Sequence, residues 1–236
     1  MGQKVSPTGF RLGVTEDWRS RWYSDKDYAK NLENDLEIRK FLEKQLAHAA
    51  VSRVEIERAG DKIKVIITTS RPGVVIGKKG AEVDALRKKL NQIANGTVSV
   101  EVVEVKRPEL DANLIAQSIA EQLENRVAFR RAMRKAVQSA RKSGAKGIRI
   151  QCAGRLGGAE MSRREWYREG RVPLHTLRAK IDYGFATAAT TMGSIGIQVW
   201  VYHGEVLPGQ KAPQPALEGS SRPNRRGRRN NDRGDK

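Results

Sequence analysis

Two lysines between two glycines form the sharpest chemical signal in the sequence. The segment Gly77-Lys78-Lys79-Gly80 follows the apolar run 74–76 and opens a stretch with helical spacing. Glycine on both sides allows a tight turn whose backbone amides can approach phosphate groups closely. The lysines add positive charge without demanding a base sequence. These residue types in this spacing therefore predict a loop that holds a nucleic-acid backbone.

Two other interpretations of this loop are open. A nucleotide-binding P-loop needs a glycine, four residues, and then Gly-Lys followed by Ser or Thr. Here Gly73 and Gly77 are separated by only three residues, and Lys79 stands where the magnesium-binding hydroxyl should be. A plain helix-initiating turn is the structural alternative. The order of the surrounding elements favours a KH module, whose loop clamps a nucleotide backbone, over both.

The elements that would position this loop follow from the spacing of apolar residues. A period near 3.6 residues predicts helices over 28–47 and 81–93. Alternating apolar residues on either side of Gly60 predict a β-hairpin, and the same alternation predicts a strand over 97–105. The resulting order is helix, strand, strand, glycine loop, helix, strand.

A long basic run is the second signal. Between Asn125 and Ala159 there are ten basic residues and no acidic one. On a helix over 129–143, the apolar residues Phe129, Met133, Ala136 and Ala140 share one side. A solvated basic face is the alternative, but the absence of any neutralising acid favours a surface that faces phosphates. The opposite side carries the cations Arg130, Arg131, Arg134, Lys135, Arg141 and Lys142.

A third cluster mixes arginine with aromatic residues between 155 and 171. Arginine beside aromatic rings suits stacking on unpaired bases, whereas core packing is the favoured alternative for at least one ring. The cluster comprises Arg155, Arg163, Arg164, Arg168 and Arg171, with Trp166 and Tyr167 among them. The complete set of candidate RNA-binding residues is Gly77, Lys78, Lys79, Gly80, Arg126, Arg130, Arg131, Arg134, Lys135, Arg141, Lys142, Arg155, Arg163 and Arg164.

Catalytic interpretations have little support. Cys152 is the only cysteine, and it alternates with Ile148 and Ile150, so we expect a small core residue and not a nucleophile. His175 follows Pro173-Leu174, which indicates a structural turn. One cysteine and three histidines give no metal-ligand cluster. We therefore expect no enzyme activity, no cofactor, no metal and no small-molecule substrate.

The charge balance selects the class of partner. The chain of 236 residues has 45 Lys and Arg against 27 Asp and Glu, a formal net charge of +18. Such a charge is self-repelling unless a polyanion neutralises it, and nucleic acid is the favoured polyanion. An anionic membrane is the alternative, but no stretch approaches the roughly 20 apolar residues of a spanning helix. We expect a cytoplasmic protein without a membrane partner or a signal peptide.

The expected fold class is α+β. We expect an extended N-terminal arm over 1–27 without clear period, a KH domain over 28–107, a second α+β domain over 108–207, and a disordered basic tail over 208–236. The second domain should contain two helices, capped by Asp111 and stopped by Gly144, and a four-stranded sheet. The strands are expected near 148–152, 163–171, 180–191 and 195–201.

Several stretches resemble the bacterial third small-subunit ribosomal protein, a family that carries a KH domain. They are residues 1–13, 71–80, 129–136 and 154–179, and the similarity extends from residue 1 to about 207. The resemblance implies a place in the head of the small ribosomal subunit, bound to ribosomal RNA. It also implies that the tenth and fourteenth small-subunit proteins are neighbours.

The resemblance further implies a role for the basic helix. Arg130, Arg131, Arg134 and Lys135 would grip messenger RNA where it enters the subunit and help to open its duplexes. Two other function classes stay open: a free KH regulator of messenger or transcription, and an enzyme such as a nuclease or a KH-containing GTPase. The long similarity over 154–179, outside any KH domain, disfavours the first, and the failed P-loop pattern disfavours the second.

Overall fold

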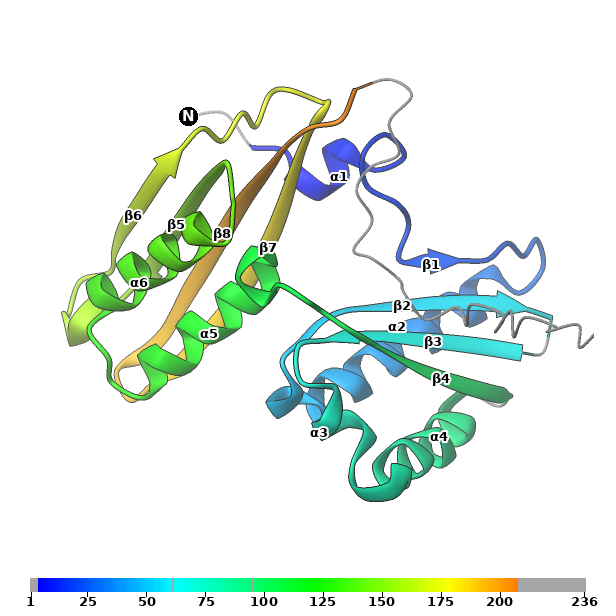
Figure 1. The fold of residues 1–236 in the computed structure, drawn as a ribbon. Coiled ribbons are helices and arrows are strands. Elements are labelled where there is room, and N and C mark those ends of the chain that lie inside the picture. The colour runs from blue at the N-terminus through cyan, green and yellow to red at the C-terminus, as the bar shows by residue number, and fades with distance from the viewer. Residues whose placement is uncertain (1–3, 61, 95, 208–236) are drawn as a thin grey trace, which may run out of the picture.

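The first half of the chain forms a sheet in the order β1-β2-β3-β4, covered by two long helices (Figure 1). The structure is a computed structural model and describes residues 4–60, 62–94 and 96–207, except for the side chain of Lys79. The predicted basic tail over 208–236 lies outside these residues. The elements are α1 (Pro7–Arg11), β1 (Ser20–Arg21), α2 (Tyr28–Gln45), η1 (Ala47–Ala49), β2 (Val51–Ala59), β3 (Lys62–Thr69), α3 (Pro72–Ile76), η2 (Lys78–Gly80), α4 (Ala81–Ala94) and β4 (Thr97–Glu104).

The predicted hairpin and helices of this unit are confirmed. Strands β2 and β3 are antiparallel around Gly60, which has a φ of 59°, and β3 pairs with β4 in parallel. Alternating side chains from the strands, such as Ile56 and Val65, pack against Ile38 of α2 and Leu90 of α4. The sheet thus buries one apolar face beneath both helices, because successive strand residues point to opposite faces.

The second half of the chain forms an antiparallel sheet in the order β6-β5-β8-β7. Helices α5 and α6 lie along one of its faces (Figure 1). The α+β fold class predicted from the sequence is confirmed. The elements are η3 (Pro108–Leu110), α5 (Ala112–Glu124), α6 (Phe129–Lys142), β5 (Gly147–Gly154), η4 (Leu156–Gly158), β6 (Arg163–Gly170), β7 (Ala179–Thr190) and β8 (Gly193–Glu205).

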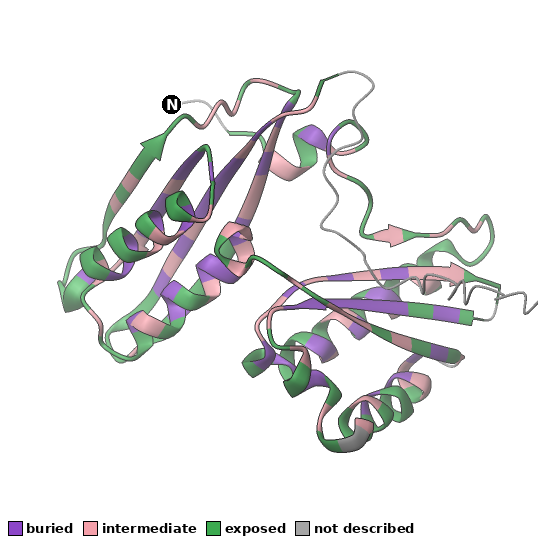
Figure 2. Cartoon of the chain, in the orientation of Figure 1, coloured by how far each residue is buried: buried purple, intermediate pink, exposed green. Residues whose placement is uncertain are grey.

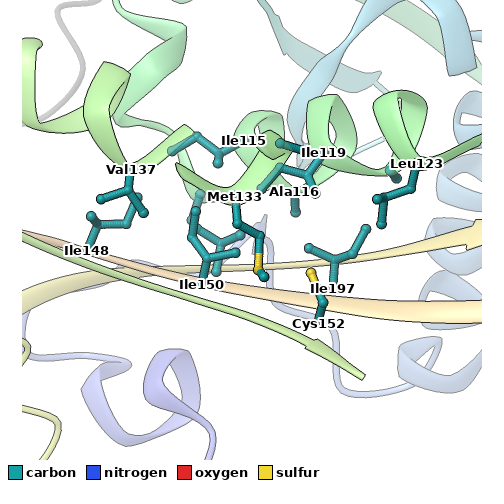
Figure 3. Packing of buried hydrophobic residues seen from close by; sticks show 14 of the residues in the cluster. Ile115, Ala116, Ile119, Leu123, Met133, Val137, Ile148, Ile150, Cys152 and Ile197 are labelled. Atoms are coloured by element: carbon teal, nitrogen blue, oxygen red, sulfur yellow. The ribbon is translucent and has the colours of Figure 1, made fainter. Parts of the chain in front are cut away.

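The core of the second unit lies between these helices and the sheet. Met133 of α6 and Ile119 of α5 point toward Ile150 and Ile197 of the strands (Figure 3). Cys152 lies among them and is fully buried, which confirms it as a core residue. As predicted, α6 ends just before Gly144, which has a φ of 102°.

The N-terminal segment is less extended than the sequence suggested, because it is tied to both units. Strand β1 pairs in parallel with β2, whereas α1 lies against β7. Arg11 of α1 is fully buried, and its guanidinium donates to the carbonyl oxygens of Ala179, Leu174 and Thr176 at 2.7, 3.0 and 3.0 Å. No hydrophobic period marked this segment in the sequence, because strand pairing and the hydrogen bonds of Arg11 hold it in place.

The two units are joined by hydrogen bonds at the start of α5. Asp111 caps the helix as predicted, accepting from the Leu114 amide at 3.0 Å and from the Ser52 hydroxyl of β2. Asn113 Nδ2 donates to the Ser52 carbonyl at 3.1 Å, and Gln117 Nε2 to the Val51 carbonyl at 3.0 Å. Among the described residues, no helix is long and apolar enough to cross a membrane.

Candidate nucleic-acid interface

The glycine loop lies between the short helix α3 and helix α4. Gly77 ends α3 with a φ of 69°, and Gly80 has a φ of 82°, so both adopt the left-handed conformation that favours glycine. A Cβ on Gly77 would lie 2.3 Å from Glu82 Cγ, whereas one on Gly80 would meet nothing within 4 Å. The first glycine is therefore required for space as well as for conformation.

A groove runs beside this loop. It has a volume of about 680 Å³ and is lined by Lys78 and Glu82, by apolar side chains such as Leu46, Val74 and Leu86, and by Gly73 and Gly77. Val75 is fully buried and anchors the loop, while Val74 and Ile76 are exposed at its rim. A charged loop beside an apolar groove suits a single strand, whose phosphates and bases need different surroundings.

Helix α6 presents its cations as the helical period predicted. Ala132, Met133, Val137 and Ala140 are buried, which adds two residues to the predicted stripe and leaves Phe129 and Ala136 half-buried beside it. The six predicted cations of the helix are all exposed. Figure 2 shows this helix as a band of exposed residues with its buried residues toward the sheet.

The six cations of α6 differ in how far other groups engage them. Arg130 Nη2 lies 3.5 Å from Glu165, and Arg141 donates from Nη1 to the Ala145 carbonyl at 2.8 Å. The guanidinium of Arg134 lies 5.8 Å from the ring centre of Tyr167. Within the described part of the chain, Arg131, Lys135 and Lys142 have no ion pair or side-chain hydrogen bond. These three are the cations most available to an external anion.

The other candidate arginines are distributed around the second unit. Arg163 of β6 lies beside α6, where its guanidinium is 5.7 Å from the ring centre of Phe129 and its Nε 3.3 Å from Glu165. Arg126 is exposed between α5 and α6 with a φ of 60°. Arg155 donates to the carbonyls of Ala159 and Met192 at 2.9 and 3.0 Å, so two of its donors already hold loops together. Arg164 is exposed on β6.

A second groove runs beside helix α6. It has a volume of about 430 Å³ and lies between the units, with Arg71 just before α3 on one side and Lys135 of α6 on the other. Glu109 and Glu121 also line it. Reasoning from the sequence missed Arg71 as a candidate, although it lies only six positions before Gly77 of the loop. The groove therefore brings Arg71 to the same hollow as Lys135 of the basic helix, whereas no described residue of the glycine loop is among its lining.

Burial shifts the pKa of two side chains, Cys152 and His203, that could otherwise react near neutral pH. Burial raises the pKa of the Cys152 thiol to about 12, so it is not a thiolate at neutral pH. Burial also lowers the pKa of His203 to about 4. His175 lies in the exposed turn after Pro173, as predicted. Among the described residues, no group of three or more His, Cys, Asp and Glu could hold a metal ion.

Comparison with protein families finds two matches, one in each of the two units. Residues 37–110 match the model of the KH domain. Residues 119–201 match the model described as ribosomal protein S3, C-terminal domain. The glycine loop lies inside the first match, and helix α6 and strand β6 lie inside the second.

Several bacterial proteins are similar over most of the chain. Small ribosomal subunit protein uS3 of Geobacter sulfurreducens is 63% identical over 211 residues, covering 89% of this chain and 100% of that protein. The uS3 protein of Trichlorobacter lovleyi is 63% identical over 210 residues, with the same coverage. That of Syntrophus aciditrophicus is 60% identical over 211 residues, covering 89% of this chain and 98% of the relative.

Proposed function

This chain belongs to the family of small ribosomal subunit protein uS3, and from that premise we propose that helix α6 binds messenger RNA as it enters the subunit. The family makes it a structural component of the small ribosomal subunit, and its KH domain implies RNA binding. The finer proposal is that Arg130, Arg131, Arg134 and Lys135 hold the incoming strand and help to open its duplexes.

The observation that carries this proposal is the set of unengaged cations on α6. Arg131 and Lys135 are exposed and lack protein partners among the described residues, and the guanidinium of Arg134 engages only the Tyr167 ring. The buried stripe of the helix fixes them on a rigid scaffold. Cations held in this way bind phosphates at any sequence, which is what a strand moving past the surface requires.

The glycine loop is proposed as a second contact with RNA. Lys78 and the backbone of Gly77 and Gly80 would hold phosphates while bases lie over the groove beside Val74 and Leu86. Arg71, in the groove shared with Lys135, would continue the positive surface toward α6. The remaining candidates, Lys79, Arg126, Arg141, Lys142, Arg155, Arg163 and Arg164, are proposed to contact ribosomal or messenger RNA.

Protein neighbours in the subunit head are also proposed, among them the tenth and fourteenth small-subunit proteins. An exposed apolar surface on the arm and α2 supports them, since such patches mark protein contacts. It comprises Tyr23, Tyr28, Leu32 and Leu36. We further propose the domain division 28–107 and 108–207, supported by the separate sheets, and a cytoplasmic location in the subunit.

Reversal of the α6 charges tests the proposal. Small subunits reconstituted with Arg131→Glu, Arg134→Glu and Lys135→Glu together should assemble normally but translate through a messenger duplex more slowly than wild type. A matched triple reversal on α4, Arg87→Glu, Lys88→Glu and Lys89→Glu, changes the same charge on another exposed helix face. Equal slowing by both variants, or failure of the α6 variant to assemble, would contradict the proposal.

A further inference from the structure

The sheet of the second unit has one face that α5 and α6 do not cover. Ile148, Ile150 and Cys152 of β5 face the helices, so the alternate residues Arg149 and Gln151 point to the opposite side. At one end two segments cover this opposite face. The segment with Val172 and Leu174 packs on the start of β7 and the end of β8, and α1 lies against β7. The remainder has no covering element among the described residues.

Strand register places a specific set of side chains in rows across this face. Directly paired residues of the four strands form each row, because partners on neighbouring strands lie side by side. The first row is Arg168, Arg149, Trp200 and Tyr183; the second is Trp166, Gln151, Gln198 and Phe185; the third is Arg164, Ala153, Gly196 and Thr187. None of the positions in these rows is acidic.

The aromatic rings on this face are held by stacking on a central arginine. The guanidinium of Arg149 lies 5.0 Å from the ring centre of Trp200 and 5.5 Å from that of Trp166. Trp200 in turn packs on Tyr183, with ring centres 5.5 Å apart. Gln151 Nε2 donates to Gln198 Oε1 at 2.9 Å and ties the second row together. The face is therefore ordered before any ligand binds.

Two rings of this ordered face are turned to solvent. Trp166 is 55% exposed and Phe185 is 56% exposed, at the two ends of the second row. Beside this row, the third row offers the small residues Ala153 and Gly196, and a Cβ on Gly196 would lie 3.7 Å from Cε2 of the Phe185 ring. Next to the first row is a hollow of about 700 Å³ whose lining includes Arg149, Arg168, Arg171 and His175.

We propose that this uncovered sheet face is a separate RNA-binding surface for unpaired nucleotides of the small-subunit ribosomal RNA. Trp166 and Phe185 stack on bases, and Arg164, Arg168 and Arg171 bind the adjoining phosphates. Exposed rings on a sheet, rimmed by cations, are the arrangement by which sheets bind single-stranded RNA. The absence of acid from all three rows selects a polyanion over a protein segment.

The position of the face selects ribosomal over messenger RNA. Helix α6 packs on the other side of the same sheet. Messenger RNA held by Arg131 and Lys135 would therefore lie on the side opposite Trp166 and Phe185. The inference rests on the proposed role of the chain as an RNA-binding component of the subunit. The stacking residues Trp166 and Phe185 are not among those proposed for messenger, so the two proposals fail independently.

Photo-crosslinking in intact subunits tests the occupant. p-Benzoylphenylalanine would replace Trp166 in the full-length chain, and Trp18 of the arm, which is 60% exposed, would be replaced as the matched control. We expect crosslinks from position 166 to ribosomal RNA in subunits without messenger, unchanged when messenger is added, and none to RNA from position 18. Crosslinks from position 166 to protein alone, to messenger alone, or to nothing would overturn the proposal.

Binding of the purified full-length chain to small-subunit ribosomal RNA gives the energetic test. Trp166→Ala should weaken binding about 5- to 100-fold, the effect of losing one stacked base, while Trp166→Phe restores most of it. Trp18→Ala should leave affinity unchanged. The thermal midpoint of each variant reports folding, and equal affinities for Trp166→Ala and Trp18→Ala at unchanged midpoints would refute stacking. The triple reversal on α6 should keep the crosslink from position 166, whatever it does to duplex opening.

Discussion

The junction around the N-terminal arm and the surface of helix α6 are both rich in arginine, and they use it in opposite ways. At the junction Arg11 is buried against carbonyl oxygens, and Arg58 Nη2 lies 2.6 Å from the buried carboxylate of Asp35. On α6, Arg131 and Lys135 are exposed and have no protein partner in the described part of the chain. The net charge of +18 thus includes cations that hold the fold and cations without a partner among the described residues.

This comparison teaches that environment, and not residue type, decides what an arginine does. A buried guanidinium loses water and must recover all its hydrogen bonds from the protein. An exposed one on a rigid helix keeps its donors for a phosphate. Removing a cation from the junction should therefore cost stability, whereas removing one from α6 should cost binding.

Removal of the Arg11 guanidinium should have the largest effect. Arg11→Met keeps much of the side-chain volume but leaves the buried Ala179 carbonyl and several part-buried carbonyls without this donor, and we expect a loss of about 3–5 kcal/mol in the free energy of unfolding. Urea denaturation of the full-length chain measures it. Arg131→Met is the matched control and should change stability by less than about 0.5 kcal/mol. Comparable losses in both variants would erase the distinction between the two regions.

Acidification should reveal the next largest effect through His203. Burial, with Lys180 nearby, lowers its pKa to about 4, against about 6.5 when unfolded. Because the folded pKa is depressed, the stability from neutral His203 is fully present above pH 6.5. It is lost as pH falls toward 4, by up to about 3 kcal/mol.

His203→Gln should flatten this part of the stability profile between pH 6.5 and 4, as followed by thermal unfolding at a series of pH values. Burial and Asp182 raise the pKa of Asp111. Its contribution to the stability of the fold therefore increases as pH falls, opposite to that of His203. A His48→Gln variant, which changes an exposed histidine, should keep the wild-type profile. A profile that His203→Gln leaves unaltered would contradict the assignment.

Substitution of the two loop glycines should have a smaller effect on the free energy of unfolding, and the effect should differ between them. Gly77→Ala must place a Cβ 2.3 Å from Glu82 Cγ at a φ of 69°, and should cost about 2–3 kcal/mol. Gly80→Ala meets open space and should cost only about 1 kcal/mol for its left-handed conformation. Urea midpoints of the two variants compare them, and equal midpoints would show that Glu82 moves aside freely.

Charge reversal on α6 should have the smallest effect on stability. Arg131→Glu, Arg134→Glu and Lys135→Glu together should change the free energy of unfolding by less than about 1 kcal/mol, because these side chains are exposed. The variant should reduce the steepness of the log–log salt dependence of single-strand binding by about 2, which is roughly 0.7 for each of three phosphate contacts. Filter binding across salt concentrations measures the slope, and an unchanged slope would remove α6 from the interface.

Local patterns in the sequence carried most of the fold. The 3.6-residue period predicted α2, α4 and α6 to within a few residues of their ends, the cap at Asp111 predicted the start of α5, and alternation predicted β2, β3 and β4. The basic side of α6 followed from the same period, because a helix wheel needs only neighbouring residues. The conformation of the loop followed from its glycines. Trp166 and Tyr167 were separated only by the structure, Trp166 to the uncovered face and Tyr167 to the core side.

What the sequence alone determined is therefore local: the elements, the apolar side of each, and the excess of positive charge. The tertiary structure decided which cations are buried or paired within the protein, and which side chains form rows on the second sheet. It also decided how Arg11 docks α1 on residues more than 160 positions away in the chain. The physical reason is that helical and strand periods arise from bonds between near neighbours. Strand register and buried hydrogen bonds are settled by contacts between distant segments, which no local period encodes.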